Sequence, residues 1–461
     1  MCRKDRQIKE LKQIIKKLQK IIVRQAEEIA DLKRRLDLNS SNSSKPPSSD
    51  GLKKPPRVCS LREKSGKKSG GQPGHKGSTL RQVENPDLIE QYEINCCPYC
   101  EIDLTSEPIV DICKKQVFDI PKIKPFITEH QFQIKCCPKC KKRVKIRDNS
   151  LAKAPVQYGP NVKATVSYLN MYNLIPEKRT AEIMGDVFSM PMSDATVENI
   201  SKTCTANVVS TVEQIKECLK KASIKGADET GIRINGKSSW VHILANNRHV
   251  HYRPSEKRGD IEKNLKGTVV HDCFAPYYNE LENVQHALCN AHILRELKAV
   301  TEIDKEPWAE NMTRILLFGQ KLVQQRPQDI TTQLLIRIKK LYDQTINKAL
   351  SYHENLGVLK KSKRGRVKRR PGHNLALRLQ KYSDDVLRFL IDSEVPFTNN
   401  QAERSLRMIK VQQKVSGCFR TFEGAEKFLT IRSYVATAQK QGYNILDALT
   451  SVFQKNPLLL V

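Results

Sequence analysis

Three carboxylates, far apart in the sequence, have the residue types that metal-dependent phosphoryl transfer needs. Asp228 lies in a strand-like stretch, Asp272 ends an apolar run, and Glu403 shares a helical face with Arg407 and Lys410. Neighbouring carboxylates repel one another, so they usually need a cation between them, and Mg²⁺ or Mn²⁺ suits such oxygen ligands. Two ions about 4 Å apart can activate the nucleophile and the leaving oxygen of a phosphodiester. The three residues are therefore candidate catalytic and metal-binding residues.

A mixed sheet would bring the two aspartates side by side. The stretches "IKGADETGIRI", "SWVHILAN" and "HVHYRPS" predict three successive antiparallel strands, with Asn235-Gly236 as a hairpin turn. A polar helix is expected from Glu256, and the run "TVVHDCFAPYY" then predicts a fourth strand parallel to the first. This strand order is typical of a ribonuclease-H-like mixed α/β domain. Glu229 is the alternative to Asp228 as the candidate carboxylate of this strand. Because successive side chains of a strand point to opposite faces, the Glu229 side chain points away from the face of Asp228.

The third carboxylate must come from a helix that follows the sheet. Thr398, with Gln401 three residues later, predicts a capping box at the start of that helix. Each residue also has a non-catalytic interpretation. Asp228 could be a turn residue at a strand end, and Glu403 could form an i,i+4 salt bridge to Arg407 on a solvated helix face.

The chain between Asp272 and Glu403 is long enough for an insertion. Apolar residues recur at helical spacing in "LLIRIKKLYDQTINKAL", so this insertion should be mostly helical. It contains the basic run "KKSKRGRVKRR", which is either a phosphate-binding loop or a solvated loop. The predicted DNA-binding residues are Lys363, Arg364, Arg366, Lys368, Arg369 and Arg370 in this run, and Arg404, Arg407 and Lys410 beside Glu403.

Two similar cysteine clusters, "CCPYC" and "CCPKC", have the spacing of zinc knuckles. Cys97 with Cys100 and Cys137 with Cys140 can converge into a tetrahedral thiolate site, and a structural Zn²⁺ is the expected ion. Cys96, Cys136 or Cys113 could replace one of these ligands. The segment between the clusters alternates as strands do, which favours a zinc-ribbon-like β module over unligated buried cysteines.

The N-terminal region is expected to self-associate. Apolar residues step by threes and fours from Ile8 to Leu36, a heptad pattern interrupted at Gln25 that favours a parallel coiled-coil dimer over a helix packed on its own chain. A linker rich in Ser, Pro, Gly and basic residues follows, either as a spacer or as a DNA contact. Beyond the cysteines, "RTAEIMGDVFSMPMSDATVENISK" predicts two helices around a turn, either a helix-turn-helix or a plain packing unit.

The overall charge indicates a polyanionic partner. Lys and Arg number 80 against 50 Asp and Glu, a formal net charge of +30. This excess points to nucleic acid. No apolar run reaches the roughly 18 residues that a membrane span needs, and no secretion signal is recognisable. We therefore expect no membrane association and a cytoplasmic location, near the nucleoid of a bacterium, where cysteines stay reduced or metal-bound.

Several motifs occur together in an order that resembles the insertion sequence 66 transposase family. They are "NSSNSSKPPSSDG", "GGQPGHKG", the paired C-P-x-C knuckles, "ADETGIRINGKSSWVHILAN" and "NNQAERSLR". Each motif alone has weak to moderate specificity, but five in the same order are highly specific. The resemblance extends from the heptads to "GYNILDAL" near the end of the chain.

The resemblance implies a bacterial DDE transposase that binds terminal inverted repeats and target DNA. Its family motifs align with Asp228, Asp272 and Glu403, and the family's chemistry implies two Mg²⁺ or Mn²⁺ ions per active site. "CNAHILREL" resembles a Cys-x-x-His element that follows the second aspartate in related enzymes, so Cys289 and His292 are auxiliary candidates. Companion proteins of the same element are usual in this family. A catalytically inactive, transposase-derived repressor and a zinc-dependent scaffold are the alternatives.

This chain differs from the family pattern at two positions. Thr398 stands where the family often has Asp, and Cys273 stands where a small residue is common. The predicted organisation is a multidomain α+β protein with these parts: coiled coil 1–38, basic linker 39–88, zinc module 89–147, helical region 155–223, catalytic core 224–300, helical insertion 301–395, and C-terminal core helices 396–461.

Overall fold

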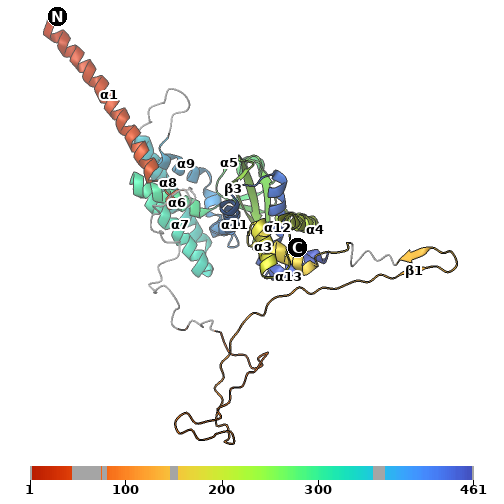
Figure 1. Cartoon of the computed structure of the whole chain (residues 1–461). Helices are drawn as coiled ribbons and strands as arrows, with labels where there is room; N and C mark the ends of the chain where they lie inside the picture. Colours follow the sequence, from red (N-terminus) through yellow and green to blue (C-terminus); the bar gives the residue numbers. More distant parts are fainter. Residues whose placement is uncertain (1–2, 44–73, 75–79, 146–153, 357–368, 459–461) are drawn as a thin grey trace.

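The computed structural model describes residues 3–43, 74, 80–145, 154–356 and 369–458. Its centre is a five-stranded mixed sheet in the order β5-β4-β3-β6-β7 (Figure 1). The strands are β3 (Ile224–Ile234), β4 (Lys237–Ala245), β5 (Val250–Ser255), β6 (Thr268–His271) and β7 (Gln285–Leu288). Strands β3, β4 and β5 are antiparallel, whereas β6 pairs parallel with both β3 and β7. The predicted order of the first four strands is confirmed.

The polar helix expected after Glu256 does not form. Residues 256–267 make a loop between β5 and β6. Arg253 Nη1 and Ser255 Oγ both donate to Asp260 Oδ2 at 2.8 Å. Ile261 and Leu265 from the same loop are buried in the core beneath the sheet. These side-chain bonds and the burial of two apolar residues hold the loop in a non-helical path that sequence periodicity does not reveal.

A helical layer packs around the antiparallel half of the sheet. It contains α2 (Pro160–Ser167), η2 (Tyr168–Tyr172), α3 (Glu177–Asp186), α4 (Asp194–Lys221), α12 (Phe422–Lys440) and α13 (Ile445–Phe453). Helix α12 runs along the edge strand β5, where Thr437 and Ser433 hydroxyls accept bonds from the Val250 and Tyr252 amides at 3.0 Å. Because these hydroxyls accept hydrogen bonds from backbone amides at the edge of the sheet, helix α12 closes this edge.

The predicted helix pair before the sheet is present as α3 and α4. Ser193 caps α4 by accepting a hydrogen bond from the Thr196 amide at 3.2 Å. Buried Met184, Val197 and Ile200 form a small core between these helices and their neighbours. Thr180 and Ser201 are also buried. The pair is therefore at least a packing unit of the core domain.

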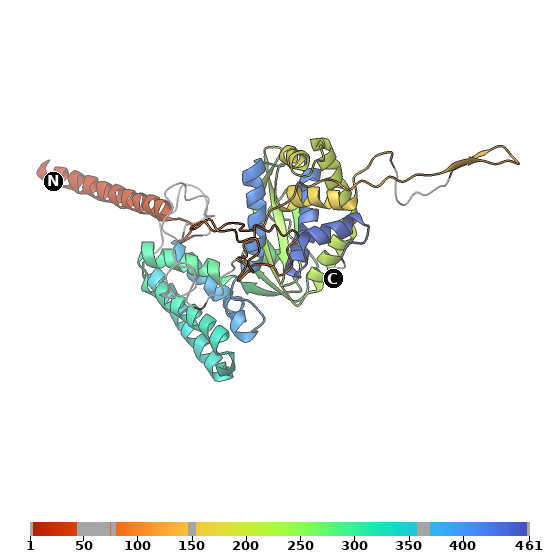
Figure 2. The same ribbon diagram turned by 60° about the horizontal axis from the view of Figure 1, so that its bottom comes forward.

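A second hydrophobic core supports the helical insertion. Its elements are α6 (Asn290–Ala299), η3 (Val300–Asp304), α7 (Pro307–Gln325), η4 (Pro327–Asp329), α8 (Thr332–Asn355), α9 (Pro371–Lys381) and α10 (Ser383–Ile391). Leu316, Tyr342 and Leu379 are fully buried among these helices. Figures 1 and 2 both show the insertion beside the sheet rather than over it. The short helix α5 (Ala275–Glu280) and helix α11 (Asn400–Ser416) complete the fold around the strands.

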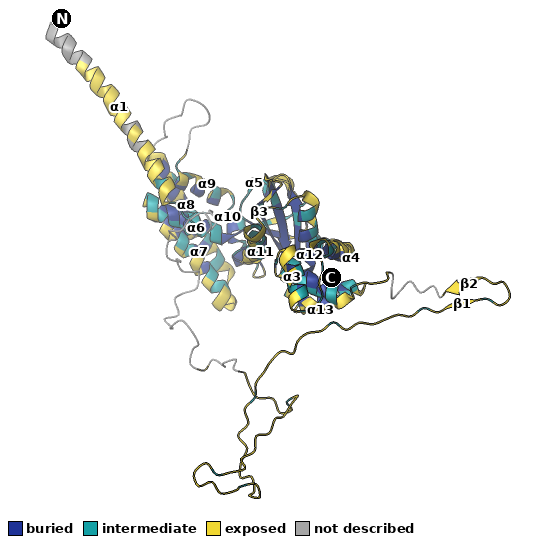
Figure 3. Ribbon diagram, viewed as in Figure 1, coloured by how far each residue is buried: buried dark blue, intermediate teal, exposed yellow. Residues whose placement is uncertain are grey.

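The described residues of the N-terminal third bury little surface. Helix α1 (Arg3–Asp37) is a single long helix whose apolar residues Leu11, Ile15 and Leu18 are more than half exposed (Figure 3). The hairpin of β1 (Ile134–Cys136) and β2 (Arg143–Lys145) lies at the tip of an extended segment. No described helix has the length and apolar character needed to cross a membrane.

Candidate active site

The register of the parallel strands sets the two candidate aspartates level with each other. Gly226 of β3 pairs with Val270 of β6. Two residues further along each strand direction are Asp228 and Asp272, the latter just past the end of β6. Residues two apart on a strand share a face, so both aspartates belong to the face that carries Gly226.

Helix α11 packs on that same face of β3. A side chain at Gly226 would meet the Asn399 side chain well inside contact distance and Ala402 at 3.5 Å. Asn399 Nδ2 donates to the backbone oxygen of Ala227 at 2.8 Å. Glu403 follows Ala402 directly, in the first turn of α11. A glycine on the strand and an asparagine at the helix start therefore position Glu403 close to the aspartates.

The predicted capping box at the start of α11 is wrong. Asn399, rather than Thr398, is the capping residue, and no side chain caps the helix by a hydrogen bond. The Gln401 side chain instead bonds Asn247. The Asn399 amide donates to Cys289 Sγ at 3.1 Å, while its side chain reaches β3. Tertiary contacts with β3 and with Cys289, the residue before α6, thus replace the local cap.

Asp228 is a buried carboxylate close to other negatively charged side chains. Burial, followed by the negative charges of Glu229, Asp272 and Glu403, raises the pKa of Asp228 well above its ordinary value. The backbone amide of Glu229 donates to Asp228 Oδ1 at 2.9 Å and opposes part of this shift. Nearby carboxylates disfavour ionisation unless a cation is present. The four acidic groups therefore interact electrostatically across β3, β6 and α11.

Glu403 contacts a second group of side chains from helix α6. Its Oε1 accepts a bond from Cys289 Sγ at 3.7 Å and lies 3.7 Å from His292 Nδ1, while Oε2 lies 3.9 Å from Arg295 Nη2. Among the described residues, Cys289, His292 and Glu403 are the one trio of potential ligands whose atoms all lie within 4.8 Å of one another. Asp228 and Asp272 are not part of this trio.

The α6 side chains are held in a buried setting at the end of β7. Burial raises the pKa of the Cys289 thiol to about 12, so the thiol is protonated and donates to Glu403. Burial and the charge of Arg295 lower the pKa of His292. The protonated thiol donates to Glu403, and the lowered pKa of His292 favours the neutral form of the imidazole. The Cys-x-x-His spacing pointed to this pair, whereas nothing in the sequence pointed to Arg295.

Asp272 lies in a strained turn. Cys273, the next residue, has a φ of +70°, a conformation that side-chain-bearing residues rarely adopt. The Phe274 amide donates to Asp272 Oδ1 at 3.0 Å, and the Cys273 amide donates to His271 Nδ1 at 3.2 Å. His271 Nε2 in turn lies 3.0 Å from His286 Nδ1. These bonds hold the turn that presents the second aspartate.

The candidate DNA-binding residues of α11 have different environments. Arg404 and Arg407 are exposed, but Lys410 is half-buried and its Nζ bonds the backbone oxygen of Gly231. Burial lowers the pKa of Lys410. Glu403 lies 3.7 Å from His292 and 3.9 Å from Arg295, and within the described residues it makes no ion pair with Arg407. Arg404 and Arg407 are therefore free to contact a phosphate, whereas Lys410 contacts the sheet.

The basic run of the insertion lies mainly beyond the region that can be described. Lys363, Arg364, Arg366 and Lys368 fall outside the described residues. Arg369 is exposed at the start of α9, and Arg370 Nη2 donates to the backbone oxygen of Leu356 at 3.4 Å. The predicted contact of this run with DNA stays a prediction.

Both cysteine knuckles form, with the same local geometry. The amides of Cys97 and Cys137 donate to Ile102 and Lys142 oxygens at 2.9 Å, and Glu101 and Lys141 both have a φ near +60°. Backbone amides of Tyr99 and Cys100 lower the pKa of Cys97, and those of Cys140 and Lys139 act likewise on Cys137. Within the described residues, the Sγ atoms of Cys97, Cys100, Cys137 and Cys140 do not come together as one group.

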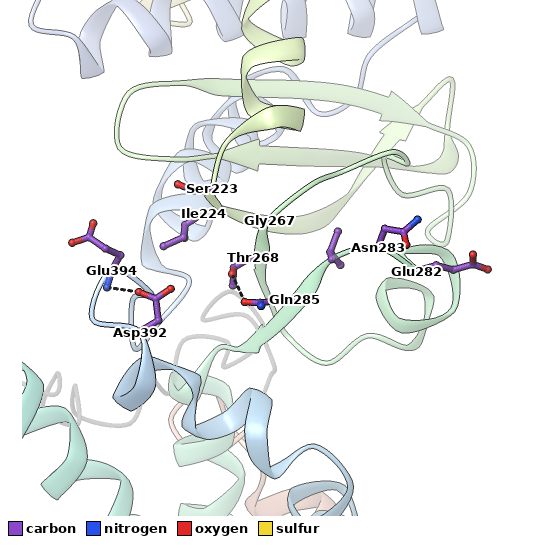
Figure 4. A pocket seen from close by; sticks show the side chains of 10 residues that line it. Ser223, Ile224, Gly267, Thr268, Glu282, Asn283, Gln285, Asp392 and Glu394 are labelled. Atoms are coloured by element: carbon purple, nitrogen blue, oxygen red, sulfur yellow. Dashed lines mark hydrogen bonds between the residues drawn. The ribbon is translucent and has the colours of Figure 1, made fainter. Parts of the chain in front are cut away.

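A cavity of about 630 Å³ lies at the other end of the parallel strands (Figure 4). Ile224, Thr268 and Gln285, at the starts of β3, β6 and β7, line it together with Asp392 and Glu394. The carboxylates Asp228 and Asp272 lie toward the opposite strand ends. The cavity is therefore separate from the candidate active site.

Comparison with known protein families defines the class of this chain. The model of the Transposase IS66 family matches residues 155–427, which include the sheet, the insertion and Glu403. The chain belongs to this transposase family. Residues 2–81 match a family of unknown function (DUF6444). No curated protein matches the chain.

Family membership agrees with the resemblance inferred from the motifs. It supports a function in DNA transposition, an enzyme of the transposase type, and DNA as the partner. It also implies the use of a divalent metal ion, and the trio around Glu403 is a possible metal site.

Proposed function

We propose that the protein is a DDE transposase that cuts DNA at the terminal inverted repeats of an insertion sequence and joins the freed ends to target DNA. The observation that carries this proposal is the position of Asp228, Asp272 and Glu403. They come from one face of β3, the end of β6 and the first turn of α11, in a chain of the Transposase IS66 family. The strand order supports a ribonuclease-H-like core.

The three carboxylates fit a hard divalent cation. The pKa of Asp228 is raised by burial and by negative neighbours, the arrangement in which a cation replaces protons most favourably. Asp228, Asp272 and Glu403 would hold Mg²⁺ or Mn²⁺, two ions per site, which would supply Lewis acidity toward the attacking and leaving oxygens. Cys289 and His292 are softer ligands, so we infer that they restrain Glu403 rather than bind Mg²⁺.

The remaining steps rest on residues of this chain. Asn399 sets the start of α11 against β3 and thereby orients Glu403. Arg404 and Arg407, exposed on the same helix, would bind phosphates on either side of the bond that is cut. In the second step, the freed 3′-hydroxyl would attack a target phosphodiester in line with the leaving oxygen.

We infer that two further modules assist the reaction. Helix α1 has exposed heptad residues and would pair with a second copy as a coiled coil. Backbone amides lower the pKa of the Cys97 and Cys137 thiols, one in each knuckle, which favours thiolate ligands for a structural Zn²⁺. For Zn²⁺ to bind all four cysteines, the two hairpins would have to approach each other. We also propose a bacterial cytoplasmic location near the nucleoid and an association with companion proteins of the element.

The test is cleavage and joining of supercoiled DNA that carries the inverted repeats flanking the gene. Wild-type protein with Mg²⁺ is expected to nick the repeat ends and join them to target, and Asp228→Ala is expected to bind the same DNA without cutting it. A repressor derived from a transposase would bind without metal and cut nothing. If Asp228→Ala cuts and joins as well as wild type, the assignment of the catalytic residues is wrong.

A further inference from the structure

Arg258 is held rigidly beside the candidate active site. It lies in the loop between β5 and β6, and its Nε and Nη2 donate to Glu229 Oε1 at 3.0 and 2.8 Å. The Glu229 side chain is 1% exposed, whereas that of Arg258 is 45% exposed. One edge of the guanidinium thus points into the protein, and a large part of the side chain faces solvent.

Two aromatic rings hold the same guanidinium. Its Cζ lies 4.2 Å from the centre of the Phe274 ring and 5.2 Å from that of Trp240. Both rings are half-buried. A guanidinium has five N–H groups, and the bonds to Glu229 use two of them. Among the described residues, Nη1 has no hydrogen-bond acceptor, so its N–H groups can bind a ligand.

The position of Arg258 relates it to both candidate aspartates. Its partner Glu229 directly follows Asp228, and Phe274, beneath the guanidinium, donates its amide to Asp272 Oδ1 at 3.0 Å. Tyr277 donates its hydroxyl to the other oxygen of Glu229, also at 3.0 Å. Each candidate catalytic aspartate is therefore connected to the Arg258 cluster (Arg258, Glu229, Phe274, Trp240 and Tyr277) through a neighbouring residue.

A purely structural ion pair explains this arrangement poorly. A buried carboxylate costs several kcal/mol in desolvation, to order of magnitude, and apolar residues of similar size often stabilise a fold as well. Glu229 also adds negative charge next to Asp228, and it raises the pKa of that residue. A planar cation fixed between two rings, with one edge open, is instead the form in which arginine recognises phosphate groups.

We propose that Arg258 binds a DNA phosphodiester next to the one that is cut, and that Glu229, Phe274 and Trp240 hold its guanidinium for this purpose. The inference rests on the proposed transposase function. The ligand is an anionic phosphate of the DNA backbone, bound through Nη1 and the exposed edge of the guanidinium. Arg258 is a substrate-binding residue in this assignment, and the other three are positioning residues.

The test replaces single phosphates by uncharged methylphosphonates in a duplex that carries the inverted repeat flanking the gene. Binding is measured with Ca²⁺ in place of Mg²⁺ to suppress cleavage. Wild-type protein should lose about tenfold in affinity at one position near the cut. Arg258→Gln should lose a similar factor on unmodified DNA and should be insensitive to the change at that position. For Arg258→Gln, the slope of log affinity against log salt concentration should be shallower than that of wild type by about 0.9.

Arg314→Gln is the matched control. Arg314 is an exposed arginine on α7 that pairs with Glu310 of the same helix at 2.6 Å, away from the loop that carries Arg258. Arg314→Gln should leave the wild-type pattern of methylphosphonate effects unchanged. Arg258→Lys keeps the charge but lacks the planar fork, so it should fold normally and recover only part of the affinity.

Two outcomes separate this inference from the proposed function. If wild-type protein cuts the unmodified duplex but Arg258→Gln and Arg258→Lys show every methylphosphonate effect of the wild type, the role of Arg258 is refuted and the transposase function stands. If wild-type protein neither binds nor cuts the duplex, both proposals fail.

Discussion

Asn399 Nδ2 donates a hydrogen bond to the backbone oxygen of Ala227 at 2.8 Å and so ties the start of α11 to β3. This bond connects the helix of Glu403 to the strand of Asp228, although the two segments are far apart in the sequence. Gly226, next to Ala227, has no side chain to obstruct Asn399. The relative position of Asp228 and Glu403 therefore depends on the buried side-chain amide of Asn399.

Removing this amide should impair cleavage far more than DNA binding. Asn399→Ala leaves the Ala227 oxygen without its partner and frees the start of α11, and a misplacement of about 1 Å can lower a rate about 100-fold. Cleavage rates and DNA affinity measured on the same inverted-repeat duplex would show this difference. Gln401→Ala, an exposed change two residues later in the same helix turn, should keep wild-type cleavage. Equal rates for both variants would contradict the positioning role of Asn399.

The stability of the metal-free protein should decrease as pH rises, because the pKa of Asp228 is raised in the folded state. Between the unfolded value of about 3.9 and the higher folded value, the folded protein binds more protons than the unfolded chain. Its free energy of unfolding therefore falls across this window. Asp228→Asn removes this contribution and should melt at a higher temperature than wild type at neutral pH without metal.

Divalent metal should reverse the difference. Mg²⁺ should raise the melting temperature of wild type at neutral pH, and more strongly as pH rises, because it competes with protons for the carboxylates. It should have little effect on Asp228→Asn. Asp186→Asn, an exposed change at the end of α3, is the control and should respond to Mg²⁺ as wild type does. An equal response of Asp228→Asn would exclude Asp228 as a ligand.

Helix α1 should mediate self-association. Leu18→Asp places a charge at a heptad core position that is about half exposed in the single chain. It should convert the oligomer to monomer because a buried charge in a coiled-coil seam is strongly unfavourable. Light scattering after size-exclusion chromatography measures the mass directly. Lys16→Ala, on the solvated side of the same turn, should keep the wild-type mass, and a monomeric wild-type protein would refute the coiled coil.

Zinc binding should require both knuckles. Protein purified in the presence of zinc should contain a fixed amount of zinc per chain. Cys97→Ser or Cys137→Ser should each remove most of this zinc, since a four-thiolate site loses much of its affinity when any one ligand is lost. Metal analysis of the purified variants gives the result. Cys113→Ser tests the alternative ligand and should retain zinc. Full zinc content in both knuckle variants would exclude the four-cysteine site.

Much of the fold could be predicted from local sequence patterns. Alternating apolar residues and the Asn235-Gly236 turn predict the antiparallel strands, and apolar residues at helical spacing predict the insertion helices. These patterns succeed because the hydrogen bonds of a hairpin or a helix join residues that are close in the chain. The family, too, is recognisable from short motifs and their order.

The details of the site depend on contacts between distant residues. The chain after Glu256 has a helix-like composition, yet Asp260 and two buried apolar side chains hold it as a loop, and that loop carries Arg258. Likewise, Thr398 and Gln401 fit a local cap that Asn399 displaces through its bond to β3. Neither result is visible in local spacing, because the Asn399 bond joins residues 172 positions apart and the loop depends on the burial of Ile261 and Leu265.

The sequence by itself determined the residue types of the candidate site, the strands and helices that carry them, and the family. Tertiary structure alone decided that Glu403 lies against Cys289, His292 and Arg295, and that Lys410 turns to the sheet while Arg404 and Arg407 stay exposed. The physical reason is that packing α6 and α11 against the strands selects side-chain partners by proximity in space, which local spacing does not encode.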